Sequence, residues 1–376
     1  MTELSASERI DWLQLIRTPT IGPITFRQLL ARYGSAAEAL RAAPDAAARA
    51  GRSKRLRLYD RSVAEEEIDA CFQMGVDIVA LCEADYPKPL AAISDPPPLL
   101  FLRGHRSLFE KPAVAIIGAR NASGVGRKIA RTLAADLGAA DVVVTSGLAR
   151  GIDGAAHEAA IGTGTIAVVA GGVDVIYPPE HAELTERIAN EGVILSEQGL
   201  GKQPTARDFP KRNRLISGLS RGVIVVEAAS RSGTLITARF ALEQGREVFA
   251  VPGSPLDPRC QGANRLIREG AALVETAEDV LTVLAEQNRG VNDPARDLFE
   301  WADATEEPDP KETIAIRSRV LETLSFTPLH RDIILQETDG PPGLVAEALL
   351  DLVLSGEAEE HSGGAYSLAA ENASTE

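Results

Sequence analysis

The sequence is poor in the residues that build disulfide frameworks, metal sites and membrane spans. It contains only three cysteines, Cys71, Cys82 and Cys260, which are odd in number, far apart and without C-x-x-C spacing. We therefore expect neither a disulfide framework nor a zinc site, and a reducing compartment. The longest apolar run, at 165–176, is interrupted by two glycines and an aspartate, and it is too short to cross a bilayer.

Positive charge is also scarce, with 39 Lys and Arg against 54 Asp and Glu and a net charge of −15. This balance excludes nucleic-acid binding over the whole surface, so any anion site must be local. The first eight residues contain neither the basic nor the apolar part of a signal peptide, and we expect a cytoplasmic protein. The 376 residues are enough for two or three domains, each with its own core.

The middle of the chain alternates apolar runs with helical stretches. The six runs, read as buried strands, are 114–117, 142–145, 166–169, 193–195, 223–226 and 248–251. The helical stretches are 127–137, 154–161, 234–244 and 262–269. This alternation predicts an α/β fold with an extended, Rossmann-like doubly wound parallel sheet, which binds ligands beyond the carboxyl ends of its strands.

Smaller units flank this domain. We predict a helical domain at 1–65, an extension of the sheet domain at 66–111, the Rossmann-like domain at 112–285 and a polar, proline-bearing linker at 286–312. Three helices and a hairpin with Gly363 and Gly364 at its turn predict a winged-helix-like domain at 313–370.

Glycine-rich loops follow several of the predicted strands. The stretches are Gly118–Gly126, Ser146–Asp153, Ala170–Asp174 and Ser230–Thr234, and three of them lead directly into helices. Glycines allow the backbone to approach an anion, and a helix N-terminus supplies N–H donors to it. Each loop alone is equally typical of a tight turn, but several at neighbouring strand ends favour a phosphate-binding edge.

The segment 202–221 concentrates positive charge. It holds six basic residues and one acid, whereas residues 111–285 as a whole hold 19 of each sign. Phe209 lies among these cations, which suits a single strand whose bases stack on an aromatic ring while arginines bind its phosphates. The alternative is a solvated helix start, in which Arg214 pairs with a structural acid such as Glu227.

A nucleotide-processing enzyme of the lysine-decarboxylase-like Rossmann group is the competing hypothesis. Such enzymes use P-G-G-x-G-T-x-x-E, and this chain retains Gly233 and Thr234 but has Thr237 at the glutamate position. The carboxylate needed for acid–base chemistry is therefore missing. With no Walker lysine and no metal-ligand cluster in the sequence, we expect no enzyme activity, no catalytic residue and no cofactor.

The longest of these motifs resemble the DNA processing protein A family (DprA, also called Smf). The matching stretches are Asp95–Pro97, Ala115–Arg120, Ser146–Asp153, Phe209–Leu219, Ser232–Thr237 and Val251–Gly253. The resemblance implies a single-stranded-DNA-binding homodimer that protects incoming DNA and loads the RecA recombinase in natural transformation or other recombination. It implies that Arg120 is the pocket arginine, Arg207 a DNA-binding cation and Phe209 a base-stacking ring. Relatives often carry a lysine where this chain has Glu180, which removes one expected phosphate contact.

Together, the loops, the basic segment and the resemblance give one set of predicted DNA-binding residues. The set is Gly118, Arg120, Ser123, Gly126, Ser146, Gly147, Arg150, Gly171, Gly172, Lys202, Arg207, Phe209, Lys211, Arg212, Asn213, Arg214, Ser232, Gly233 and Thr234.

The flanking domains carry less information about binding. The stretch Thr20–Phe26 resembles a helix-hairpin-helix or SAM-like unit, although Thr20 replaces the usual first glycine, and it either binds DNA or only packs. Residues 313–376 hold three basic and eleven acidic residues, and the expected recognition helix at 343–355 has no lysine or arginine. Such a helix would face DNA phosphates with the wrong sign, so we expect a protein-interaction or regulatory role for this domain.

Overall fold

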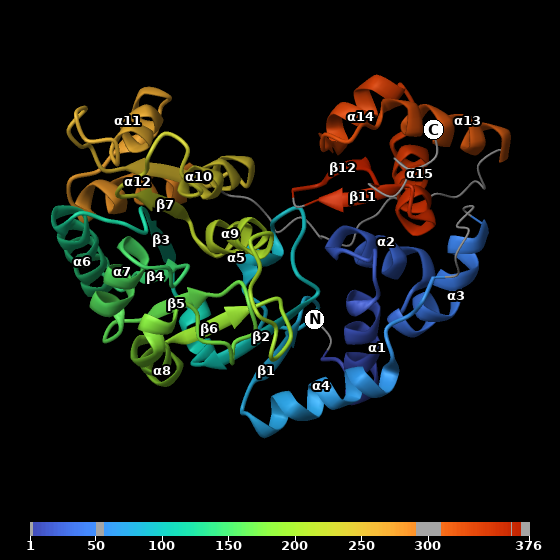
Figure 1. Cartoon of the computed structure of the whole chain (residues 1–376), viewed down its shortest axis with the longest axis horizontal. Helices are drawn as coiled ribbons and strands as arrows, with labels where there is room; N and C mark the ends of the chain where they lie inside the picture. The colour runs from blue at the N-terminus through green and yellow to red at the C-terminus, as the bar shows by residue number, and fades with distance from the viewer. Residues whose placement is uncertain (1–2, 50–55, 291–309, 362, 370–376) are drawn as a thin grey trace. The chain divides into compact units, whose positions relative to one another are not determined.

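A computed structural model describes residues 3–49, 56–290, 310–361 and 363–369 (Figure 1). The chain forms two compact units. One comprises residues 1–68, 94–98 and 297–376, and the other comprises residues 69–93 and 99–296. Most of the predicted linker, at 291–309, lies outside the described residues.

The second unit is built on a nine-stranded sheet with the order β1-β2-β6-β5-β4-β3-β7-β8-β9. The strands are β1 (Asp77–Ala80), β2 (Leu99–Gly104), β3 (Ala113–Ile117), β4 (Val143–Ser146), β5 (Thr165–Val168), β6 (Val193–Ser196), β7 (Gly222–Val225), β8 (Glu247–Ala250) and β9 (Ala272–Leu273). From β6 to β9 all neighbours pair in parallel, and β1 and β2 extend the sheet antiparallel at the β6 edge. The predicted doubly wound α/β class is confirmed.

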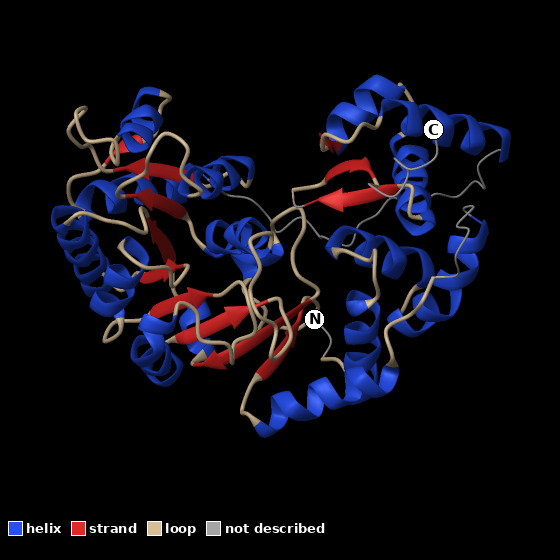
Figure 2. Ribbon diagram, viewed as in Figure 1, coloured by secondary structure: helices blue, strands red, loops and turns tan. Residues whose placement is uncertain are grey.

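Helices cover both faces of this sheet (Figure 2). They are α5 (Lys88–Ala91), α6 (Gly124–Ala139), α7 (Ile152–Ala160), α8 (Ala182–Glu191), α9 (Asp208–Leu219), α10 (Thr234–Glu243), α11 (Gln261–Arg268) and α12 (Ala277–Gly290), with short 3₁₀ turns at Arg106–Glu110 and Pro179–His181. Buried residues of α5, α9, α10 and α11 form one core with the sheet, and those of α6, α7 and α12 form the other. The strands read as continuous apolar runs because both of their faces are buried.

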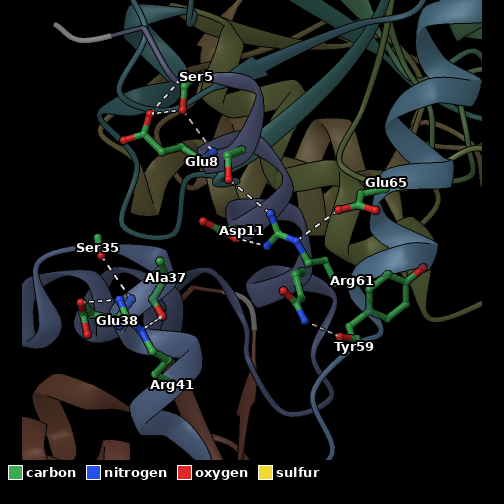
Figure 3. A network of polar contacts seen from close by, with 12 residues as sticks. Ser5, Glu8, Asp11, Ser35, Ala37, Glu38, Arg41, Tyr59, Arg61 and Glu65 are labelled. Carbon is green, nitrogen blue, oxygen red and sulfur yellow. Dashed lines mark hydrogen bonds and ion pairs between the residues drawn. The ribbon is translucent and has the colours of Figure 1, made fainter.

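The N-terminal helices are α1 (Ala6–Arg17), α2 (Pro23–Tyr33), α3 (Ala36–Arg49) and α4 (Arg61–Gln73). Helix α1 begins with a capping box in which the side chains of Ser5 and Glu8 each accept a backbone N–H of the other residue. Arg61 pairs with Asp11 and with Glu65, joining α4 to α1 (Figure 3). The turn before α2 places Thr20 at φ 75°, where glycine would be unstrained.

The C-terminal domain contains α13 (Pro310–Thr323), α14 (Arg331–Thr338), α15 (Pro342–Ser355) and the strands β10 (Leu329–His330), β11 (Ala358–His361) and β12 (Ala365–Leu368). Its sheet has the order β10-β12-β11 with antiparallel pairs, and its core lies between this sheet and the helices. Three helices with a small antiparallel sheet confirm the predicted winged-helix fold.

Among the described residues, no helix is long and apolar enough to span a membrane, and no group of three or more His, Cys, Asp or Glu side chains could hold a metal ion. Cys71, Cys82 and Cys260 form no disulfide bond with one another.

Candidate nucleic-acid interface

A hollow beside the glycine loops lies where the strand order reverses. Strands β3 and β7 are neighbours in the sheet, yet the chain leaves them toward opposite edges, and ligands of open α/β sheets bind at such a point. A cavity of about 840 Å³ opens there, and its lining includes Gly118, Arg120, Asn213, Thr234 and Arg259.

A second cavity of about 400 Å³ shares part of this lining. Arg120, Arg150, Tyr177 and Phe209 are among the side chains that surround it. Because Arg120, Tyr177 and Phe209 line both hollows, they form the ridge between them.

This ridge combines aromatic faces with a cation. The guanidinium carbon of Arg120 lies 5.1 Å from the centre of the Phe209 ring, and the Phe209 and Tyr177 rings are 5.4 Å apart at 51°. A cation at this distance from a ring is attracted by its π face. The same ridge therefore offers a ring face to a base and a guanidinium to a phosphate.

Four exposed cations belong to this region, and three of them line neither cavity. Lys202, Arg207 and Lys211 are exposed, as is Arg120. Within the described part of the chain, no carboxylate lies within ion-pair distance of any of these four side chains. Their charge is available to an external anion.

Arg212 has a different environment from its neighbour Lys211. Its side chain is 5% exposed, and its guanidinium donates to the carbonyl of Gly147 at 2.6 Å and to that of Val168. Burial lowers the pKa of Arg212 to about 10, while the facing carboxylate of Asp153 opposes that shift. Burial raises the pKa of Asp153, against the attraction of Arg212 and the N–H donors of nearby loops. Arg212 and Asp153 are buried opposite charges in the lining of the larger cavity, and each favours the charged form of the other.

Arg214 is also held internally. It is buried and pairs with Glu197 rather than with Glu227, the partner that the sequence suggested. Arg150 remains exposed and pairs with Glu180 at 2.6 Å, so this predicted DNA-binding arginine has an acidic partner within the protein.

Carboxylates of the protein occupy the N–H donors of two glycine loops. At the start of α6, Glu227 accepts the backbone N–H and the hydroxyl of Ser123, and a Cβ on Gly126 would lie 2.6 Å from that carboxylate. In the loop after β4, Asp153 accepts the N–H of Gly147 at 3.2 Å. These glycines are needed for internal close approaches.

The loop after β5 is held by internal contacts, whereas part of the loop after β7 is open to solvent. After β5, Gly172 donates its N–H to the carbonyl of Lys202, and a Cβ on Gly171 would meet that same carbonyl. After β7, the Thr234 hydroxyl donates to the carbonyl of Gly118, which ties this loop to the loop after β3. The nearby Gly233 is exposed, with no atom within 4 Å of the place where a Cβ would stand.

The structure thus brings about half of the predicted residues to the cavities. Those that line one or both are Gly118, Arg120, Gly147, Arg150, Phe209, Arg212, Asn213, Ser232, Gly233 and Thr234. Those that line neither are Ser123, Gly126, Ser146, Gly171, Gly172, Lys202, Arg207, Lys211 and Arg214.

Among the lining side chains that the sequence prediction omitted, Tyr177 and Arg259 are the aromatic ring and the cation. Tyr177 follows the loop after β5, and an exposed aromatic next to a proline was the signal available for it. Arg259 lies before α11 and lines the larger cavity, where its guanidinium also pairs with Asp257 at 2.7 Å. No motif marks Arg259, because it reaches the site only through the fold.

Three family models match successive parts of this chain. Residues 77–285 match the family described as DNA recombination-mediator protein A, residues 6–70 match the DprA-like N-terminal HHH domain, and residues 304–364 match the DprA winged helix domain. The chain belongs to the DprA/Smf family.

Individual DprA and Smf proteins are similar over long stretches. The DNA processing protein DprA of Streptococcus pneumoniae is 49% identical over 198 residues, which are 52% of this chain and 70% of that protein. The protein Smf of Escherichia coli is 39% identical over 274 residues, which are 72% of each chain.

Two solved DprA structures share the fold. The X-ray structure of DprA from Streptococcus pneumoniae has a TM-score of 0.62 and 37% identity, over 75% of this chain and 98% of the other. A DprA structure from Helicobacter pylori, described as giving insight into a single-stranded DNA binding mode, has a TM-score of 0.52 and 31% identity, over 56% of this chain and 96% of the other.

Proposed function

We propose that this protein binds single-stranded DNA at the cavity edge of the large sheet and acts as a DNA recombination mediator. The observation that carries the proposal is the ridge of Arg120, Phe209 and Tyr177 between two cavities, with the exposed cations Arg207 and Lys211 nearby. The family membership and the single-stranded DNA binding described for the Helicobacter pylori relative support it.

The shape of the site favours single strands over duplex. A base must leave a stack and turn toward the protein to reach the faces of Phe209 and Tyr177, and only an unpaired strand can do this at low cost. Arg120 and Arg259 line the larger cavity, and arginine can bind phosphate through two parallel N–H donors.

A binding role also fits the chemistry of the cavities better than hydrolysis. Among the described residues that line them, the only carboxylate is that of Asp153, which already accepts two backbone N–H groups and faces Arg212. Thr237 lies in the lining at the position where the competing enzyme group has its glutamate. We propose that the site binds its ligand without turning it over.

The wider role that we propose is the one that the resemblance to DprA/Smf proteins implies. A homodimer would protect the bound strand and load the RecA recombinase onto it, in natural transformation or in other recombination. Both steps require a binding site that holds phosphates through exposed cations and can therefore release the strand.

The test is a set of single substitutions measured by fluorescence anisotropy with a labelled single-stranded oligonucleotide. Phe209→Ala should weaken binding by about 1–3 kcal/mol through lost base stacking. Arg120→Ala should weaken it about tenfold, which corresponds to about 1.4 kcal/mol. The control is Arg239→Ala on α10, which removes the same charge from an exposed arginine that lines neither cavity. Equal affinities for Arg120→Ala, Phe209→Ala and the control would refute the proposed site.

A further inference from the structure

The wing of the C-terminal domain places a carboxylate at the N-terminus of α2, within the first unit. Glu360 on β11 accepts the backbone N–H groups of Ile24 and Thr25 at 3.2 and 3.0 Å and the Thr25 hydroxyl at 2.6 Å. A Cβ on Gly22 would lie 2.6 Å from this carboxylate, so glycine is what allows it to enter. The helix end, the hydroxyl and the glycine form a cradle that holds an oxyanion.

The acids of the expected recognition helix face the same domain. Helix α15 packs against α2 and α3, and Arg32 of α2 lies 3.3 Å from Glu347 and 3.9 Å from Asp351. These two acids are the only charged residues of α15, the helix that we expected to face a DNA groove with the wrong sign. Both acids therefore pair with an arginine of the N-terminal domain.

The groups on the α2 side are those that hold a DNA backbone. Backbone N–H groups at a helix N-terminus, a threonine hydroxyl and an arginine are typical donors to phosphate oxygens. Three carboxylates of the C-terminal domain, those of Glu347, Asp351 and Glu360, now occupy these donors. The acidic C-terminal domain thus places carboxylates at the donors of α2 that could otherwise bind the phosphates of a nucleic acid.

The three blocking acids differ in how deeply they are buried. Burial raises the pKa of Glu360, although the hydrogen bonds from Thr25 and Ile24 act in the opposite direction. The two pairs made by Arg32 are partly exposed, and pairs of that kind contribute little to stability.

We propose that the winged-helix domain is an internal mimic of the DNA backbone that blocks the α2 face of the N-terminal domain. When Glu347, Asp351 and Glu360 leave this face, Arg32 and the N-terminus of α2 bind backbone phosphates. The blocked face lies in a different unit from the cavities of the large sheet, so the inference does not rest on the function proposed for them.

The test compares two triple variants of the full chain that change the net charge equally. The first is E347A/D351A/E360A, which removes the three blocking carboxylates. The control is E322A/E337A/E359A, which removes three exposed acids of the same domain that have no ion pair in its described part. Both are measured by anisotropy with a labelled duplex, the form that the sheet cavities should bind poorly, and with the matching single strand.

The first triple variant should bind the duplex at least about fivefold more tightly than the control. Its affinity should also depend more steeply on salt, by about 0.9 in log–log slope for each new phosphate contact. Hydrogen exchange at the amides of Ile24 and Thr25 should be faster than in the control. Equal duplex affinities in the two variants would overturn the proposal, because the gain would then reflect net charge alone.

Arg32→Glu supplies a second check that does not depend on the triple variant. It places a carboxylate against Glu347 and Asp351, and this repulsion should loosen the C-terminal domain, seen as faster exchange at Ile24 and Thr25, without any gain in duplex affinity. A gain in affinity would show that the blocked face is not where DNA binds, and unchanged exchange would show that the acids of α15 do not hold the domain in place.

Discussion

Replacing Arg212 by methionine should destabilise the sheet unit, whereas the same replacement of Lys211 should leave stability unchanged and weaken DNA binding. The two residues are adjacent on α9, but only Arg212 is buried. Methionine keeps much of the length and apolar volume of either side chain, so the comparison isolates the charged ends. The contrast separates a structural cation from a ligand-binding one.

The expected loss of stability follows from the groups that Arg212 contacts in the wild-type protein. Its replacement takes the opposite charge away from the buried carboxylate of Asp153. It also removes the hydrogen bonds that the buried carbonyls of Gly147 and Val168 accept from Arg212. Each buried carbonyl that loses its hydrogen-bond partner costs about 1–3 kcal/mol, and the loss of the charge opposite Asp153 adds to this cost. For a unit of this size we expect the unfolding midpoint to fall by roughly 10 °C.

The assay is thermal unfolding followed by circular dichroism, with single-strand binding measured on the same preparations. Lys211→Met should unfold at the wild-type temperature and bind the oligonucleotide several-fold more weakly. If Arg212→Met unfolds with the wild type and loses only DNA affinity, Arg212 is a ligand-binding residue and the structural role described for it is mistaken.

Two further predictions concern local stability. Thr20→Gly should raise the free energy of unfolding by about 0.5–1 kcal/mol, because a β-branched residue is strained at φ 75°; an unchanged midpoint in denaturant titration would contradict the strain. Burial lowers the pKa of His157 from 6.5 to about 3, so below pH 6.5 the unfolded state binds a proton that the folded state does not. Stability should therefore fall by up to about 1.4 kcal/mol for each pH unit between 6.5 and 3. His157→Asn should reduce that slope in denaturant titrations at pH 6 and pH 4, and an identical slope would refute this assignment.

The fold could be predicted from the sequence because local patterns carry it. Continuous apolar runs separated by helical stretches require a parallel sheet covered on both faces. The alternation also placed the site, since the carboxyl ends of such strands meet at one edge. The pairing of β1 and β2 beside β6 could not be read in this way, because their partner lies almost a hundred residues away.

Within the site, the sequence could not separate the cations of α9 by composition alone. Helical spacing does carry the distinction, since Arg212 lies three, four and seven residues before the buried Leu215, Ile216 and Leu219. The partners that occupy the glycine loops, Glu227 and Asp153, come from other elements and are fixed only by the tertiary fold. For the same reason, a loop typical of phosphate binding can be occupied by a carboxylate of the protein.

The most direct test of the central claim is an anisotropy titration of the wild-type protein with single-stranded and duplex oligonucleotides of equal length over a salt series. We expect tighter binding of the single strand at every salt concentration, with a slope that reports a few phosphate contacts at about 0.7 each. Equal affinities for the two forms at moderate salt would contradict a site in which bases reach Phe209 and Tyr177.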